Sequence, residues 1–152
     1  MTGTGDPFDL QRFVDAQDPV VAQVRAELTV GRKASHWMWF VFPQLAGLGR
    51  SLMAQTYAIS GLAEGEAYLR HAALGPRLRE FTALAIAAPV RRAEDVFGWP
   101  DDRKFQSSMT LFAQAAASNV LLGEALFQKA LGRFFDGVPD PETLRRLQEP
   151  LV

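Results

Sequence analysis

Residues 31–51 read GRKASHWMWFVFPQLAGLGRS, and this stretch holds two of the three tryptophans and one of the two histidines. Its apolar run, which ends at Pro43, fits either a helix or a buried strand, because periodicity does not separate the two. No other segment has a clear strand pattern that would pair with it. We therefore predict a helix from His36 to Phe42, with Ser35 as its N-cap.

Helix boundaries are marked on both sides of this stretch. Asp-Pro pairs stand at residues 6–7, 18–19 and 140–141. Aspartate accepts N–H bonds at a helix N-cap, and proline fits the first helical position because its missing donor is not needed there. Gly31 is typical of a left-handed helix end, and Ser51 of an N-cap. With the apolar spacing elsewhere, these signals predict an all-α fold, a compact single-domain array of about seven to nine short helices.

The length and composition fit one domain. The chain has 152 residues, of which 48% are hydrophobic, and this is enough to fill a single core. We expect one helical domain over residues 6–149, a disordered N-terminus at residues 1–5 and a tail at residues 150–152.

Charge and residue usage argue against several classes of function. The formal net charge of -1 gives no general attraction to phosphate backbones, so general nucleic-acid binding is not expected. The chain has no cysteine and two histidines, so we expect no disulfide, no metal site and no cofactor. The N-terminus lacks a signal-like pattern, and no apolar stretch is long enough to span a bilayer. A cytoplasmic protein without membrane contact, monomeric or weakly dimeric, is the expectation.

The turn at the end of the quoted stretch is a candidate anion-binding loop. Gly47 and Gly49 would let backbone N–H groups converge on an anion, Ser51 begins a helix, and Arg50 can bind a phosphate or carboxylate through two hydrogen bonds. It is not a P-loop, since Gln44 stands at the first glycine position and arginine replaces the lysine. The loop and Gln44 are nevertheless predicted to contact ligand. The alternative is an ordinary interhelical turn with a capping serine.

His36 is the candidate acid–base residue of the stretch. Imidazole titrates near neutrality, and in the first turn of a helix the dipole would favour its neutral form. Ser35 beside it is a candidate ligand contact, and Trp37 or Trp39 could stack on a ligand ring, although most of these aromatics are expected in the core. The alternative is a histidine that hydrogen-bonds a neighbouring backbone group.

A second polar cluster, WPDDRKFQSSMTLF, spans residues 99–112. On a helix, Asp101, Lys104 and Ser108 share one face beside an apolar stripe. We predict catalytic roles for Asp101, Asp102 and Lys104, and ligand contacts for Ser107 and Ser108. The lysine precedes the serines, which is the reverse of the Ser-x-x-Lys order of acyl enzymes. The alternative is a capping aspartate with a lysine as its ion-pair partner.

These motifs together resemble a known family. SHWMWFVFPQ (residues 35–44), GLG (47–49), PDD (100–102) and SSMTLF (107–112) look like the motifs of a bacterial family of unknown function, some members of which are labelled calpastatin. The resemblance covers nearly everything from Asp6 to Leu147. It implies a mainly helical single domain and supports the helix at His36 to Phe42, but it brings no established activity. The calpastatin label does not fit, because that inhibitor is disordered and this chain is rich in residues that pack.

Three functional hypotheses follow. The first is an enzyme or binding protein for a small anionic metabolite, such as a nucleotide or an ADP-ribose derivative, with His36 and Asp101 or Asp102 as acid and base. It requires the two clusters to meet at one hollow. The second is a non-catalytic interaction module that docks a partner protein through exposed aromatics of residues 31–51. The third is that both clusters only specify the fold.

Overall fold

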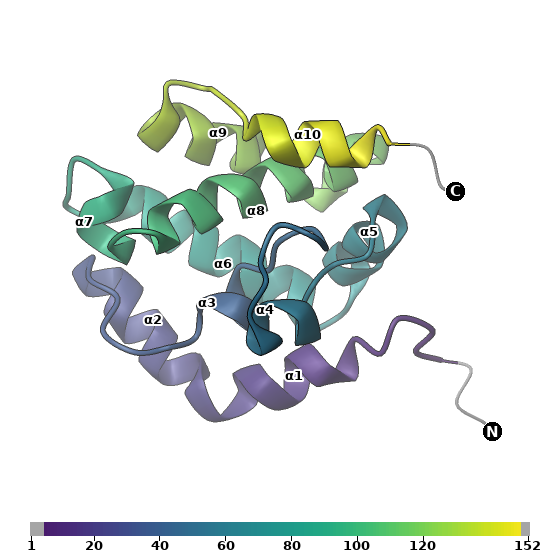
Figure 1. Ribbon diagram of the computed structural model, residues 1–152. Coiled ribbons are helices and arrows are strands. Elements are labelled where there is room, and N and C mark those ends of the chain that lie inside the picture. The colour runs from purple at the N-terminus through teal and green to yellow at the C-terminus, as the bar shows by residue number, and fades with distance from the viewer. Residues whose placement is uncertain (1–4, 150–152) are drawn as a thin grey trace.

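The computed structural model describes residues 5–149, and these residues form an array of helices (Figure 1). The expected disorder at residues 1–4 and the expected tail at residues 150–152 lie outside the described residues. The α-helices are α1 (Gln11–Gln17), α2 (Val21–Val30), α3 (Met38–Val41), α4 (Leu52–Thr56), α5 (Leu62–Arg70), α6 (Leu74–Ala87), α7 (Ala93–Phe97), α8 (Asp101–Ala115), α9 (Glu124–Phe135) and α10 (Pro141–Leu147). Short 3-10 helices span Asp18–Val20, Ala116–Ser118 and Val120–Leu122.

The predicted all-α class is confirmed. The described residues contain no strand, and their β-type pairing is limited to an isolated bridge between Leu45 and Ile59. Among the described helices, none combines the length and the apolar character needed to cross a lipid bilayer.

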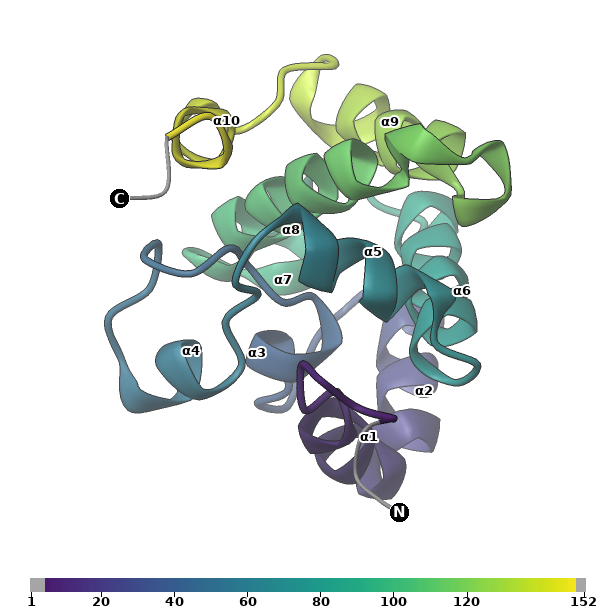
Figure 2. The same ribbon diagram turned by 90° about the vertical axis from the view of Figure 1, so that its right-hand side faces the viewer.

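Helix α8 lies at the centre of the array. It packs against α5, α7, α9 and α10, while α6 packs against α2, α5 and α9. Figures 1 and 2 both place α9 and α10 on one side of α8 and α1 and α2 on the other. The sequence explains this position, because the predicted apolar stripe Phe105, Met109 and Phe112 is fully buried. The buried stripe fixes the orientation of α8, and with it the position of the polar residues at the start of this helix.

Most of the predicted helix boundaries are confirmed. Ser51 and Asp140 accept backbone N–H bonds as N-caps of α4 and α10. Gly31 ends α2 with a φ of 90°. Helix α1 begins at Gln11 and not at the predicted Pro7, although the Asp6 carboxylate accepts the N–H groups of Leu10 and Gln11. Asp18 differs, because it begins a 3-10 helix and its side chain does not cap.

The helix predicted from His36 to Phe42 is shorter in the structure. Helix α3 begins at Met38, so Ser35 and His36 precede it. The Ser35 hydroxyl donates to the Glu27 carboxylate at 2.6 Å instead of capping α3. The prediction that Ser35 caps this helix and that its dipole acts on His36 was therefore wrong, since a tertiary contact outcompetes the local cap.

Candidate functional site

The two polar clusters meet at the start of α8. The Asp101 carboxylate forms ion pairs with Lys33 on one oxygen, at 3.0 Å, and with Lys104 on the other, at 3.3 Å. The Lys33 ammonium lies 5.2 Å from the centre of the Trp37 ring, and the Lys104 ammonium 5.9 Å from that of Trp39. Residues far apart in the sequence thus lie together at the start of α8, although Trp37 is buried and Lys33 is nearly so.

Beside this ion-pair cluster lies a small pocket, here called the Trp39–Lys104 pocket. It is lined by Met38, Trp39, Phe42, Gln44, Leu45, Gly49, Ala54, Tyr57 and Lys104. Four of the predicted site residues are among them: Trp39, Gln44, Gly49 and Lys104. The volume is ≈10 Å³, which is about the space of one water molecule. Polar groups therefore converge here, although the closed pocket is too small to enclose a metabolite.

The pocket is covered by the 46–58 loop, which carries α4 and extends away from the helical body (Figure 2). The loop is closed at its base, where Ala46 N–H donates to the Ile59 carbonyl at 2.8 Å and Ile59 N–H to the Gln44 carbonyl at 2.9 Å. At Gly49 a Cβ atom would lie 2.5 Å from the Ala54 Cβ. Glycine at position 49 thus lets the two sides of the loop approach each other closely.

The aromatic residues of the stretch have unequal access to solvent. Trp37 is only 1% exposed, and Phe40 and Phe42 are also buried, so the predicted ligand stacking on Trp37 is excluded in this conformation. Trp39 is half-buried, whereas Trp99 is 74% exposed. The same burial removes the exposed aromatic patch on which the interaction-module hypothesis depended.

Glu27 organises this region, and the sequence interpretation missed it. Its carboxylate accepts hydrogen bonds from the Ala34 N–H at 2.8 Å, the Trp37 indole N–H at 2.8 Å and the Ser35 hydroxyl, and Gln23 donates to it as well. Burial acts to raise the pKa of Glu27, but these hydrogen bonds outweigh it and lower the pKa to about 2. No local pattern identifies Glu27, because it lies on the preceding helix.

His36 and Arg50 lie outside the pocket. Both are exposed, and among residues 5–149 no hydrogen bond or ion pair of either side chain is present. The guanidinium group that faces the glycine turn belongs to Arg146 of α10, since a Cβ atom at Gly47 would lie 2.5 Å from its Nη1. The structure therefore does not bring His36 or Arg50 to the Trp39–Lys104 pocket.

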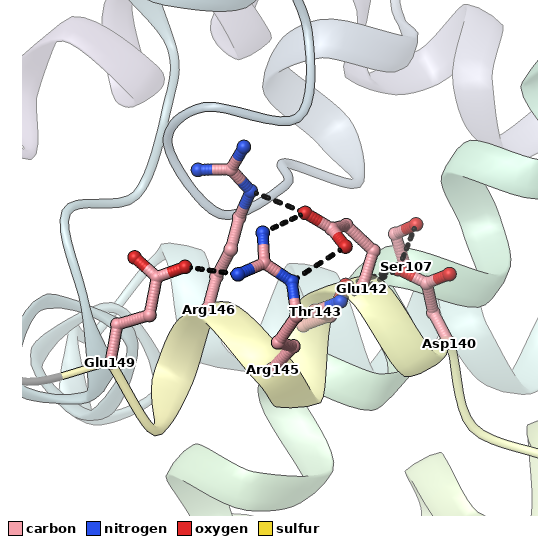
Figure 3. A network of polar contacts seen from close by, with 7 residues as sticks. All are labelled: Ser107, Asp140, Glu142, Thr143, Arg145, Arg146 and Glu149. Carbon is pink, nitrogen blue, oxygen red and sulfur yellow. Dashed lines mark hydrogen bonds and ion pairs between the residues drawn. The ribbon is translucent and has the colours of Figure 1, made fainter.

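The two serines of the second cluster are differently placed, and within residues 5–149 only Ser107 contacts the start of α10. The Ser107 hydroxyl donates to the Asp140 carboxylate at 3.1 Å, next to the Glu142, Arg145 and Arg146 ion pairs (Figure 3). Ser108 is fully buried, and its hydroxyl has no hydrogen-bond partner within the described residues. Ser107 is therefore engaged in docking α10, and Ser108 is inaccessible to a ligand in this conformation because it is buried. Ser35 is likewise occupied by Glu27, and Ser51 by the α4 cap.

Asp102 faces a different hollow from Asp101. It lines a space of ≈220 Å³ together with Arg92, Arg103, Phe134 and Phe135. One of its carboxylate oxygens is buried and has no hydrogen-bond partner within residues 5–149. The two neighbouring aspartates therefore do not form a pair, and Asp101 alone belongs to the cluster beside Trp39.

The Trp39–Lys104 pocket offers an ammonium, a partly exposed indole, an amide and a phenol. Such a set can bind an anionic group and contact a ring. In the part of the chain that the structure describes, no group of three or more His, Cys, Asp or Glu side chains is placed to hold a metal ion.

Comparison with known proteins identifies the family. No curated protein matches the chain significantly. The crystal structure of the conserved hypothetical protein Rv1873 from Mycobacterium tuberculosis is similar, with 50% sequence identity, a TM-score of 0.90, and coverage of 95% of this chain and 100% of that one. Residues 7–147 match the family described as "Protein of unknown function (DUF1810)". The resemblance seen in the motifs is thus confirmed, and the chain belongs to the DUF1810 family.

Proposed function

We propose that this protein binds a small anionic metabolite with a planar ring, of the nucleotide or ADP-ribose kind, at the Trp39–Lys104 pocket. The supporting observation is the position of the Lys104 ammonium, 5.9 Å from the centre of the Trp39 ring at the edge of a hollow that also presents Gln44 and Tyr57. An ammonium attracts phosphate or carboxylate, and an indole face stacks on a ring. The two groups are on different elements and are held together by the fold.

The size of the pocket defines how a ligand would be bound. At ≈10 Å³ the closed pocket has no room for a ring. The anionic group would therefore lie next to Lys104 at the mouth, with the ring against Trp39, and the 46–58 loop would move outward to admit it. Loops that move to admit or enclose a ligand are known at many enzyme sites.

The contacts favour binding over hydrolysis. Hydrolysis by side chains needs a nucleophile or activated water next to a free base. Asp101 is held between two lysines, and His36 does not line the pocket. The described lining residues contain no nucleophile hydrogen-bonded to a base.

The proposal is tested by thermal shift with nucleotides, sugar phosphates and ADP-ribose. A ligand at a hundred times its dissociation constant stabilises the folded state by about 2.7 kcal/mol. Lys104→Gln should abolish the shift and Trp39→Leu should reduce it. Lys129→Gln is the matched control, because Lys129 is exposed on α9 and should leave the shift unchanged. Arg50→Ala should have a smaller effect than Lys104→Gln.

A result with no shift for any compound contradicts the proposal, as does equal behaviour of Lys104→Gln and Lys129→Gln. Circular dichroism of each variant separates loss of binding from loss of folding.

Docking of a partner protein is a second candidate, favoured by two exposed apolar side chains on α4. Leu52 is 79% exposed and Met53 37% exposed. Loss of partner capture in Leu52→Ser, combined with no metabolite shift in the wild type, would favour this candidate over the first.

A further inference from the structure

We propose that the Trp39–Lys104 pocket selects monoanionic groups, such as a carboxylate or a phosphodiester, over dianionic phosphomonoesters. This inference rests on the proposed function and specifies its ligand class. It is carried by the arrangement of three charged side chains, Lys33, Asp101 and Lys104, which are 9%, 20% and 31% exposed.

Lys33 is fixed away from the pocket. Its backbone N–H donates to the Val96 carbonyl at 2.7 Å, and its ammonium is ion-paired with Asp101 and lies next to the Trp37 ring. It is not among the residues that line the pocket. Its role is to neutralise Asp101, so that this carboxylate does not fully compensate Lys104.

Asp101 connects the two lysines. One carboxylate oxygen contacts Lys33 and the other contacts Lys104. Two positive charges and one negative charge leave a net charge of about one positive unit, and of the three only Lys104 reaches the lining. Asp101 is thus a positioning residue that holds the Lys104 ammonium and limits the charge presented to a ligand.

Other nearby charges do not increase the positive charge of the pocket. Asp102 faces the separate hollow with Phe134 and Phe135. Glu27, whose carboxylate accepts a hydrogen bond from the Trp37 indole, brings the sum over the four groups to about zero, so among the described residues Lys104 is the one charged side chain that lines the pocket. Arg50 is exposed and is not among the lining residues.

A monoanion matches this charge, whereas the second charge of a dianion has no partner and lies close to Asp101. For two like unit charges roughly 4 Å apart, the repulsion changes affinity from about fivefold at the dielectric of bulk water to about a thousandfold at that of a protein surface. Lys104 is partly exposed, so we expect a value near the lower limit, about tenfold. The wild type should therefore bind the monoanion of a matched pair about tenfold more tightly.

The experiment is isothermal titration at pH 8 and constant ionic strength with two pairs matched in their rings: benzoate with phenyl phosphate, and cyclic AMP with AMP. The first member of each pair is a monoanion, and the second is a dianion at this pH. Asp101→Asn should raise the affinity for the dianions about tenfold, with a smaller gain for the monoanions. Lys33→Gln should lower the affinity for all four compounds, because Asp101 then fully neutralises Lys104.

Asp136→Asn is the matched control. Asp136 is exposed after α9, so this substitution makes the same change in net charge away from the pocket and should leave the ratios unchanged.

The outcomes separate the two proposals. If none of the four compounds binds the wild type at millimolar concentration, the proposed function fails, and this inference fails with it. If Lys104-dependent binding is present but the dianions bind as well as the monoanions, or the ratio is the same in Asp101→Asn, the charge selectivity is overturned and the proposed site stands. Lys33→Gln supplies an independent measurement if Asp101→Asn does not fold.

Discussion

At the scale of single residues, Glu27 fixes the segment that leads into α3. Its carboxylate gathers hydrogen bonds from the backbone and side chains of residues 34–37, and in this way it buries Trp37 and places Lys33 near Asp101. A charge-assisted hydrogen bond is stronger than a neutral one, so the ionised form of Glu27 is the one that stabilises this arrangement.

Glu27→Gln should lower the free energy of unfolding at pH 7 by about 1–2 kcal/mol, after allowance for partial exposure. The pKa of Glu27 in the folded protein, about 2, lies below the ordinary glutamate value of 4.5. The stabilisation is therefore complete above pH 4.5 and is lost as the pH falls towards 2. Urea unfolding between pH 7 and pH 3 should show the difference between wild type and variant becoming smaller as the pH falls. The exposed Asp15→Asn is the control, and a pH-independent difference for Glu27→Gln would contradict the assignment.

At the scale of elements, the sequence predicts boundaries that depend on neighbouring residues and misses those that depend on distant ones. Ser51 and Asp140 cap helices within their own turn, and both were predicted. The start of α3 was not, because Ser35 bonds to Glu27 on another helix. The same holds for Ser107, whose partner Asp140 is 33 residues away. Residue types alone therefore indicated a polar cluster at residues 99–112. That Ser107 of this cluster binds the start of α10 depends on tertiary packing, which no local sequence pattern encodes.

Two helical glycines, Gly75 and Gly132, should respond in opposite ways to replacement by alanine. A Cβ atom at Gly75, in α6, would lie 2.1 Å from the Leu69 carbonyl oxygen, so Gly75→Ala forces the backbone apart and should lower stability by about 2 kcal/mol or more. Gly132, in α9, has nothing within 4 Å of that position, and alanine there should add about 0.5–1 kcal/mol. Thermal unfolding of both variants measures the contrast. A loss of stability in both variants would show that α9 needs its glycine for another reason.

At the scale of the whole molecule, Arg12 joins three parts of the chain. From α1 its guanidinium donates to the Thr56 and Ala58 carbonyls and forms an ion pair with Glu64 of α5 at 2.9 Å. The Glu64 side chain is only 4% exposed. This contact holds the returning end of the 46–58 loop against the body, so it also determines how the cover of the pocket is anchored.

Arg12→Met should lower the free energy of unfolding by about 3 kcal/mol or more, because it leaves the Glu64 charge buried without its cation. Arg12→Met combined with Glu64→Gln should recover part of the loss. Arg70→Met, which removes an exposed pair with Glu66, should change little. Chemical denaturation of the wild type, Arg12→Met, the double variant and Arg70→Met measures these differences in the free energy of unfolding. Equal effects of the Arg12 and Arg70 substitutions would show that the buried Glu64 ion pair contributes no more to the free energy of unfolding than an exposed one.

The unequal burial of the three tryptophans gives the protein a built-in optical reporter. Trp37 is 1% exposed and Trp99 is 74% exposed, so iodide in solution should quench the emission of Trp99 and leave that of Trp37. Trp39, half-buried at the mouth of the pocket, is the indole whose emission should respond to an arriving ring. Occupancy of the site and opening of the interior can thus be followed as separate spectral components, without attaching a dye.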